Sequence, residues 1–185
     1  MLWKCIFDLI TNRGKRVDPN GPREGEYAVD IHSSLCGWFN VHPERYMWDG
    51  SALVAWPGWE DEELEKTKDR VWEQIKAERD RRVNGGFKVE VRADEFKWYH
   101  SDQKSRIQHL GLKAAGAAVP AIPWKTMDGS FEPMSEAIAT AVFNAALALD
   151  TALFTKAEQH KALMRASADP EGYDFSAGWP ERYEE

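Results

Sequence analysis

The chain has only two cysteines among its 185 residues, Cys5 and Cys36. Neither belongs to a CxxC pair or has a partner at a metal-ligand spacing, so a disulfide framework and a zinc-finger type of site are excluded as organising features. Two reduced, semi-buried thiols in a chain that folds in a reducing cytosol are the simplest interpretation. A bond between the two cysteines stays open as an alternative.

Long apolar runs and excess positive charge are also missing. No run approaches the roughly 20 consecutive apolar residues that a membrane helix needs. The opening stretch MLWKCIFDLI contains a lysine and an aspartate, and no small-residue cleavage site follows it, so no secretion signal is predicted. With 31 acidic and 24 basic residues, the net charge is −7. Such a chain gains nothing from phosphate electrostatics, so we expect neither a membrane nor a nucleic acid as a partner.

The sequence also lacks a pattern that organises catalysis or holds a cofactor. The triplet His100–Asp102 contains the residue types of a catalytic triad, but triads are assembled from distant segments, and serine and aspartate are good helix caps. Asp30, His32 and His42 could supply metal ligands, yet the polar face of a strand explains them as well. The glycines match neither a phosphate loop nor a dinucleotide fingerprint. We therefore predict no enzyme, no cofactor and no metal site.

Tryptophan, by contrast, is abundant, with nine residues spread from Trp3 to Trp179. Each indole brings a large contact area and one N–H donor, and such side chains are enriched at interfaces. Most are expected to be half-buried in a small core. The aromatic residues that look exposed by their position in loops are the candidates for partner contacts. These are Trp38, Phe39, Trp48, Trp56, Trp59, Tyr173, Phe175 and Trp179.

Residues 1–58 read as a small β-meander. In EYAVDIH, the apolar residues Tyr27, Val29 and Ile31 alternate with polar ones, which is typical of a strand with one wet face. Further along, Asp49-Gly50 separates two apolar runs, a strong signal for a hairpin. The first third of the chain is therefore predicted as a β module.

Residues 59–84 are predicted to form a charged connector helix. Acidic residues fill its first turn and arginines its last, which complements the helix dipole, and Asn84 followed by two glycines supplies the cap. The apolar stripe is thin, which favours a connector or one half of a coiled-coil contact over a core helix.

Residues 85–166 are predicted as hairpin, helix, hairpin and long helix, which makes the chain an α+β protein. The first helix is expected to start near Ser101 or Asp102 and to end at Pro120. In WKTMDGSFEPM, Asp128-Gly129 suits a two-residue type I′ turn, and Ser135 is placed to cap the next helix. Residues 167–185 form an extended tail that lies loose or straps onto a neighbouring molecule.

The long C-terminal helix is expected to use one face for packing. Small alanines along such a face let helices approach closely. The residues on it are Ile138, Val142, Ala145, Leu149 and Ala152, while Phe143, Leu147, Leu153 and Phe154 lie partly off it. The hairpins of the same chain would cover the remaining side chains in one arrangement, and identical chains would cover them in a symmetric oligomer in the other. Both alternatives are open.

The second half of the chain also carries a family likeness, over about residues 79–166. The matching positions are Gly86-Phe87, Ser101-Asp102, Ser105-Arg106, Trp124-Lys125, Asp128-Gly129 and Phe131, followed by the alanine-rich helix. In this order they resemble a domain of unknown function that recurs in tail genes of tailed bacteriophages and prophages. Family members usually have a glycine in the first hairpin turn, where this chain has VRADEF.

This resemblance implies a bacteriophage virion structural protein, a tail, tail-fibre or collar component that acts through protein–protein contacts. It implies no catalytic residues. The expected partners are other phage tail or fibre proteins, with further copies of the chain in a homo-oligomer. The expected location is the virion tail, after synthesis in the host cytoplasm. A tail-fibre assembly chaperone that is not retained in the particle is the alternative.

Overall fold

The computed structural model describes residues 1–118 and 121–184, which divide into two compact units, Met1–Lys66 and Thr67–Glu185. The prediction that Pro120 ends a helix lies outside the described residues. Small antiparallel sheets and four α-helices are both present, so the predicted α+β class is confirmed. The predicted module of residues 1–58 falls within the first unit, which also takes in the start of the connector helix.

The main sheet of the first unit has three antiparallel strands, β1 (Leu2–Asp8), β2 (Gly14–Val17) and β3 (Glu26–His32). Their order is β2-β1-β3, because β3 returns to pair along the whole of β1. The predicted meander, in which each strand pairs with the one before it, is therefore wrong in its strand order. The central strand is β1 because it is the most apolar, with three consecutive buried residues from Cys5 to Phe7.

The predicted alternation of β3 is confirmed, since one face of the sheet packs into an aromatic core. Tyr27, Val29 and Ile31 lie against this core, opposite residues of β1 that point the same way. The other wall of the core comes from α1 (Gly37–Val41) and from the hairpin of β4 (Tyr46–Trp48) and β5 (Leu53–Ala55). The fully buried members of the core are Cys5, Phe7, Cys36 and Phe39, with Ile31 nearly so.

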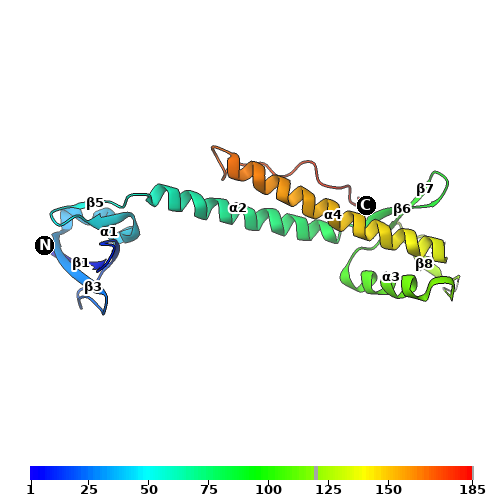
Figure 1. Ribbon diagram of the computed structural model, residues 1–185, viewed down its shortest axis with the longest axis horizontal. Coiled ribbons are helices and arrows are strands. Elements are labelled where there is room, and N and C mark those ends of the chain that lie inside the picture. The colour runs from blue at the N-terminus through cyan, green and yellow to red at the C-terminus, as the bar shows by residue number, and fades with distance from the viewer. Residues whose placement is uncertain (119–120, 185) are drawn as a thin grey trace. The chain divides into compact units, whose positions relative to one another are not determined.

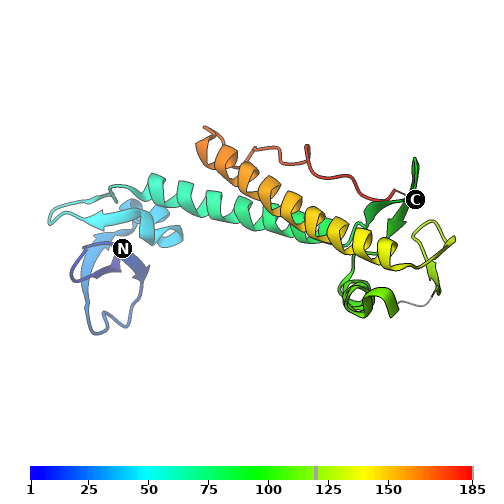
Figure 2. The same cartoon turned by 45° about the vertical axis from the view of Figure 1, so that its right-hand side comes forward.

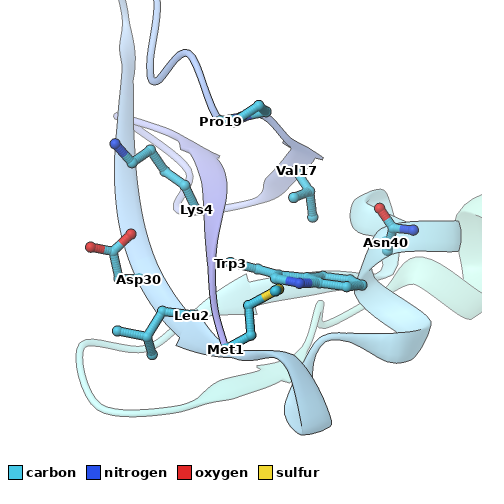
Figure 3. Close-up of a pocket in the computed structure, with 8 residues that line it drawn as sticks. All are labelled: Met1, Leu2, Trp3, Lys4, Val17, Pro19, Asp30 and Asn40. Carbon is cyan, nitrogen blue, oxygen red and sulfur yellow. The ribbon is translucent and has the colours of Figure 1, made fainter.

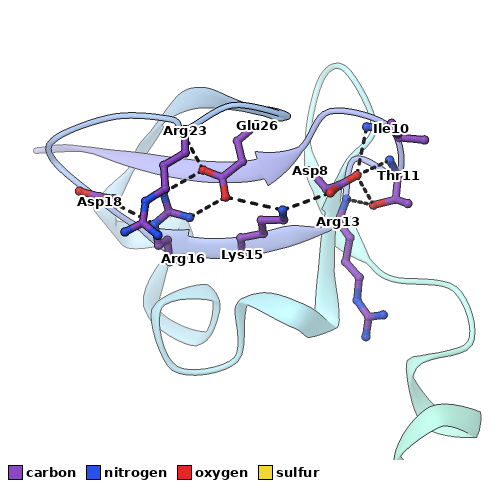
Figure 4. A network of polar contacts seen from close by, with 9 residues as sticks. All are labelled: Asp8, Ile10, Thr11, Arg13, Lys15, Arg16, Asp18, Arg23 and Glu26. Atoms are coloured by element: carbon purple, nitrogen blue, oxygen red, sulfur yellow. Dashed lines mark hydrogen bonds and ion pairs between the residues drawn. The ribbon is translucent and has the colours of Figure 1, made fainter.

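The opposite face of the sheet carries a chain of charged side chains (Figure 4). The Arg16 guanidinium donates to both carboxylate oxygens of Glu26 at 2.8 Å, and Lys15 lies between Glu26 and Asp8. The hydrogen bonds from Arg16 lower the pKa of Glu26 to about 2. Ile6 sits opposite Arg16 on this face and is fully buried, since the apolar stems of long charged side chains cover apolar neighbours.

The connector helix is observed as α2 (Trp59–Val83), close to its predicted limits of 59–84, and the boundary between the units falls inside it. Glu60, Asp61 and Glu62 occupy its first turn, and Arg81 and Arg82 its last, as the charge pattern predicts. Both buried residues of the helix, Val71 and Ile75, belong to the second unit.

The second unit continues with the predicted sequence of hairpin, helix, hairpin and long helix. The elements are β6 (Phe87–Arg92), β7 (Glu95–Tyr99), α3 (Gln103–Ala115), the 3₁₀ turn η3 (Gly116–Ala118), β8 (Pro123–Lys125), β9 (Phe131–Pro133) and α4 (Glu136–Ala166). Both views in Figures 1 and 2 show α4 running alongside the second half of α2. The hairpin of β6 and β7 packs on the first half of α4.

Two helix caps follow the sequence pattern. The Asp102 side chain accepts a hydrogen bond from the Ser105 backbone N–H, and the Ser135 side chain accepts one from the N–H of Ile138. Each satisfies a backbone donor that the first turn of a helix leaves unpaired. The VRADEF turn of the first hairpin is tight, and Asp94 adopts the positive φ of 61° that a glycine would otherwise supply.

The turn between β8 and β9 differs from the prediction. The backbone N–H of Thr126 donates to the Ser130 carbonyl, and the N–H of Gly129 donates to the Thr126 carbonyl, so three residues rather than two make the loop. Within the turn only Gly129 has a positive φ, at 81°, whereas a type I′ turn needs two such residues. The Asp128 carboxylate accepts hydrogen bonds from Ser130, Thr126 and Lys97, which hold its pKa well below the usual range.

The face that α3 buries also differs from the apolar stripe of the sequence. Ile107 and Leu110 are more than half exposed, whereas His109 is buried and Leu112 packs against the core. The face towards α4 is set by the contacts of Arg106 with Asp150 and of Lys113 with Thr140. Because α3 is short and has few apolar residues, these polar contacts determine which of its faces lies against α4.

On α4, the predicted positions Val142 and Leu149 are buried as expected, but Ala152 is exposed. Leu153, expected off the packing face, is fully buried. The buried face of a helix this long drifts around its axis as its neighbour changes from the hairpin to α2, so no single five-residue stripe describes it.

Residues 167–184 lack regular secondary structure, but they do not lie loose. They return along α4 and α2 of the same unit (Figures 1 and 2), where Tyr173 and Trp179 pack on the helices. At the far end of this segment the Tyr183 N–H donates to the Gly85 carbonyl, 2.8 Å away. We call residues 167–184 the C-terminal strap.

Candidate functional site

Trp38 and Phe39, two adjacent residues predicted as partner contacts, differ in their exposure to solvent. The Trp38 side chain is 72% exposed on α1, as a contact residue requires. Phe39 is fully buried, with its ring centroid 5.2 Å from that of Phe7. The prediction of Phe39 as a partner contact is therefore wrong. The short helix that carries both residues has one face on the core and one in solvent, and Phe39 takes the inner face.

Trp48, Trp56 and Trp59 are half-buried and already have neighbours within the first unit. Trp48 packs on the aromatic core. The Arg13 guanidinium lies 5.1 Å from the Trp56 ring centroid, and that of Arg45 lies 4.8 Å from the Trp59 ring. Cation–π contacts of this kind hold an indole in place while leaving part of it open to solvent.

The three predicted contact residues of the strap, Tyr173, Phe175 and Trp179, also have neighbours within their own unit. The Tyr173 hydroxyl lies 2.9 Å from His160 Nδ1, and the Trp179 indole N–H donates to the Phe175 carbonyl at 2.7 Å. All three side chains cover a small cluster of buried residues, Val71, Ile75, Ala157 and Met164. Their first role is therefore to close the unit's own core.

One open surface of the first unit lies at the start of β1. A hollow of about 510 Å³ is present there, and we call it the β1 notch. Figure 3 shows Trp3 and Met1 side by side within it, with Val17 and Asn40 to one side and Lys4 and Asp30 to the other. Its full lining is Met1, Leu2, Trp3, Lys4, Val17, Pro19, Asp30 and Asn40.

The notch exists because β2 is shorter than β1. The register pairs β2 with β1 from Cys5 to Phe7, and beyond it the Asp18 N–H donates to the Lys4 carbonyl at 3.1 Å. The chain then turns away at Pro19, which fixes the backbone and has no N–H to donate. Backbone groups two residues apart point to the same edge of a strand. Those of Leu2 therefore point into the notch, where the described residues place no further strand.

Two exposed apolar side chains line the notch. Met1 is 86% exposed and Leu2 64% exposed, both at the start of β1. Elsewhere in the first unit, Leu35, Trp38 and Val41 are each more than 60% exposed. Single exposed apolar residues are ordinary, but a group of them beside an unpaired strand edge is typical of a protein-binding surface. An open edge of this kind accepts an extended peptide as an additional strand.

The second unit contains a buried polar residue that the sequence did not single out. His109 is 2% exposed, and its ring lies 5.3 Å from that of Trp124 and 5.8 Å from that of Phe87. Neither ring nitrogen has a hydrogen-bond partner among the described residues. Burial lowers the pKa of His109 to about 4, so the ring is neutral at pH 7. His109 packs among aromatic rings, and no acidic side chain of the described residues lies at hydrogen-bond distance from it. We therefore assign it a packing role.

The residues considered for chemistry are not assembled into a reactive site. The Ser101 hydroxyl accepts the Gly86 backbone N–H at 2.8 Å, and Asp102 caps α3. His32 contacts Ser34, and His42 contacts Glu44. Over residues 1–118 and 121–184, no group of three or more histidine, cysteine, aspartate or glutamate side chains is placed to hold a metal ion.

One helix is notable for its apolar composition. By length and composition α4 could cross a membrane, and it is the one helix in the described parts of the chain with this property. In the second unit it packs against α3, β6 and α2 instead. Two of its apolar side chains, Leu147 and Leu163, are 58% and 59% exposed.

Comparison with curated proteins and with solved structures gave no match. One family model matches residues 66–177. Its start coincides within one residue with the start of the second unit at Thr67. The family therefore corresponds to the helical unit and the first part of its strap, up to residue 177, rather than to the β module. The matched segment covers more than half of the chain, and the protein therefore belongs to the family described as Domain of unknown function (DUF4376).

Proposed function

We propose that this protein is a bacteriophage virion structural protein, a tail, tail-fibre or collar component that acts by binding other virion proteins. The phage assignment is supported by the resemblance of residues 79–166 to a domain found in phage tail genes. The binding role is supported by one structural observation, the β1 notch with its unpaired strand edge and its exposed apolar rim.

The proposed mode of binding is strand addition. An extended apolar segment of a neighbouring tail protein pairs with the backbone of Leu2, in line with β2, and places its side chains against Met1 and Trp3. Main-chain hydrogen bonds supply affinity in such contacts, and the pockets beside the strand supply specificity. Lys4 and Asp30 at the rim select the charges that flank the apolar segment.

Leu2→Asp tests this mode, with Ile10→Asp as the matched control. Both side chains are well exposed, at 64% and 91%, so neither change removes core packing. Leu2 lies in the notch, whereas Ile10 lies beyond the other end of β1. We expect Leu2→Asp to lower incorporation into particles at least tenfold, because a carboxylate in the apolar notch opposes docking, and Ile10→Asp to leave incorporation unchanged. Equal incorporation of both variants would contradict strand addition at the notch.

The location is tested by quantitative mass spectrometry of purified phage particles, with this polypeptide counted against the major capsid protein. A fixed copy number supports a tail component. Absence from particles together with abundance in infected-cell lysate, bound to a fibre protein, supports the alternative of an assembly chaperone. Absence of any stable partner in both fractions would contradict both functions.

Self-association is proposed as well, through the second unit. Several apolar side chains of α3 and α4 are more than half exposed, among them Ile107, Leu110, Leu147 and Leu163. Burial of such residues between identical chains would remove apolar area from water. Light scattering coupled to gel filtration measures the mass directly, and a strict monomer at micromolar concentration would contradict self-association of the free chain.

A further inference from the structure

The two cysteines of the first unit lie side by side in its core. Cys5 is on β1 and Cys36 immediately precedes α1, and their Sγ atoms are 3.6 Å apart. Both side chains are fully buried, and both thiols are free. This is van der Waals contact between sulfur atoms from segments 31 residues apart in the chain.

The distance to be closed is small. A disulfide has a sulfur–sulfur length of about 2.05 Å, so the two atoms must approach by roughly 1.5 Å. Cys5 is held on both sides, by Val17 of β2 and Val29 of β3. Cys36 lies at the junction of two short helical segments, η1 (Ser33–Leu35) and α1, where a small backbone shift meets less resistance.

We propose that Cys5 and Cys36 form an intrachain disulfide when the folded protein meets a small-molecule disulfide such as oxidised glutathione. The bond ties β1 to α1. These elements carry Trp3 and Asn40, which both line the β1 notch (Figure 3). The oxidised pair thus fixes the geometry of the candidate binding surface.

The reaction is a double thiol–disulfide exchange and needs no other reactant. One cysteine loses its proton, and its thiolate attacks a sulfur of oxidised glutathione, which releases one glutathione thiol and leaves a mixed disulfide on the protein. The second cysteine thiolate then attacks the protein sulfur of that mixed disulfide and releases the second glutathione thiol. The two protein thiols are oxidised, and the glutathione disulfide is reduced to two thiols.

The environment of the pair makes this reaction slow and its product durable. Burial, together with the neighbouring Cys36 thiol, raises the pKa of Cys5 to about 12, so its reactive thiolate is scarce at pH 7. The oxidant reaches the sulfurs only when α1 moves away from the sheet. The same cover shields the finished bond from reductants.

The test is to incubate the full-length protein with oxidised glutathione, block remaining thiols with N-ethylmaleimide, and measure intact mass and peptide maps. One arm is native and a second contains urea below the unfolding transition, so that access to the core does not limit the result. The expected product has lost two hydrogen atoms, takes up no maleimide, and yields a cross-linked peptide joining Cys5 and Cys36. Two maleimide-reactive thiols in both arms, a lasting glutathione adduct, or a bond between chains would overturn the proposal.

Two further measurements separate the bond from incidental oxidation. Cys36→Ala keeps a small apolar side chain in the core, and it is expected to stop at a glutathione adduct or to stay unmodified. In the wild-type chain, oxidation is expected to slow amide hydrogen exchange in residues 37–41, and dithiothreitol is expected to reverse this. Unchanged exchange there in the fully oxidised protein would show that the bond does not tie α1 to the sheet.

Discussion

The two units bury their apolar surface in different ways. The first surrounds a cluster of aromatic rings with a sheet, a short helix and a hairpin, all from the first 66 residues. The second packs the hairpin of β6 and β7, with buried Phe87 and Tyr99, on the long helix α4 and closes a separate cluster between α2 and α4 with the C-terminal strap. Its long-range ion pairs, Arg70 with Glu171 and Arg165 with Asp69, join residues about 100 positions apart. The first unit can therefore complete its core early in synthesis, whereas the second must wait for the end of the chain.

The largest expected effect comes from removal of the strap. Truncation after Ser167 takes away Tyr173, Phe175 and Trp179, and so exposes Val71, Ile75 and Met164. Loss of a large buried aromatic side chain costs about 3–5 kcal/mol, and three half-buried ones together cost at least as much. We expect hydrogen exchange in α2 and α4 to approach that of an unfolded chain, with β1 to β3 unchanged.

The exposed Glu181→Ala variant is the control for the truncation and is expected to exchange like the wild type. Equal protection of α2 against hydrogen exchange in the truncated and full-length chains would show that the strap is dispensable. The second unit would then not depend on the end of the chain to complete its core.

The second largest effect is expected for Phe39→Ala in the first unit. The ring is fully buried between Phe7 and Tyr46, and one edge faces Gly14. The cavity left behind should cost about 4 kcal/mol. Denaturant unfolding followed by hydrogen exchange is expected to show loss of protection in β1 to β3 alone. The neighbouring Trp38→Ala serves as the control, with an expected change below about 1 kcal/mol because its side chain is exposed.

The smallest of the three effects depends on pH and belongs to the second unit. His109 has a pKa of about 4 in the folded chain and an ordinary value of 6.5. Between these values the unfolded chain binds more protons than the folded chain. The stability that the second unit gains by burying the neutral His109 ring is therefore fully present above about pH 6.5 and is lost as the pH falls towards 4. The full difference corresponds to about 3 kcal/mol. Asp102 opposes the shift, while Arg106 and His100 favour it.

Urea unfolding at several pH values, read out by hydrogen exchange in each unit, checks this expectation. His109→Phe keeps a ring in the aromatic setting and removes this titration, so the pH dependence of the second unit below pH 6.5 should be reduced. Burial also lowers the pKa of His160, which keeps a part of the dependence in the variant. The same slope in variant and wild type would assign the pH dependence to other groups.

The elements that the sequence predicts well are those with a strong local signal. The acids and arginines of α2, the Ser135 cap of α4 and the Asp102 cap of α3 each act within one helix turn. Hairpins were also found correctly, because β-forming residues flank each turn. The details of the turn at Asp128 were wrong, since its side chain bonds to Ser130 and Thr126 and stabilises a longer loop than the dipeptide alone suggests.

What could not be predicted depends on contacts between distant segments. The order β2-β1-β3 is set by which strand buries most apolar surface, and no local pattern reports it. Trp38 and Phe39 are adjacent and both aromatic, and only the core behind α1 decides which one is buried. The β1 notch arises from the early end of β2, and the docking of the strap leaves no periodic pattern in a segment without secondary structure.

The early end of β2 also bears on the solubility of the free chain. Unpaired strand edges with apolar neighbours are the places where folded proteins join into aggregates, and a lysine on the edge is a common safeguard. Lys4 stands at this position in the notch, between Leu2 and the strand pairs that begin at Cys5. Lys4 therefore opposes self-pairing of the free chain at this edge, and its replacement by an apolar residue is expected to lower the concentration at which the isolated protein precipitates.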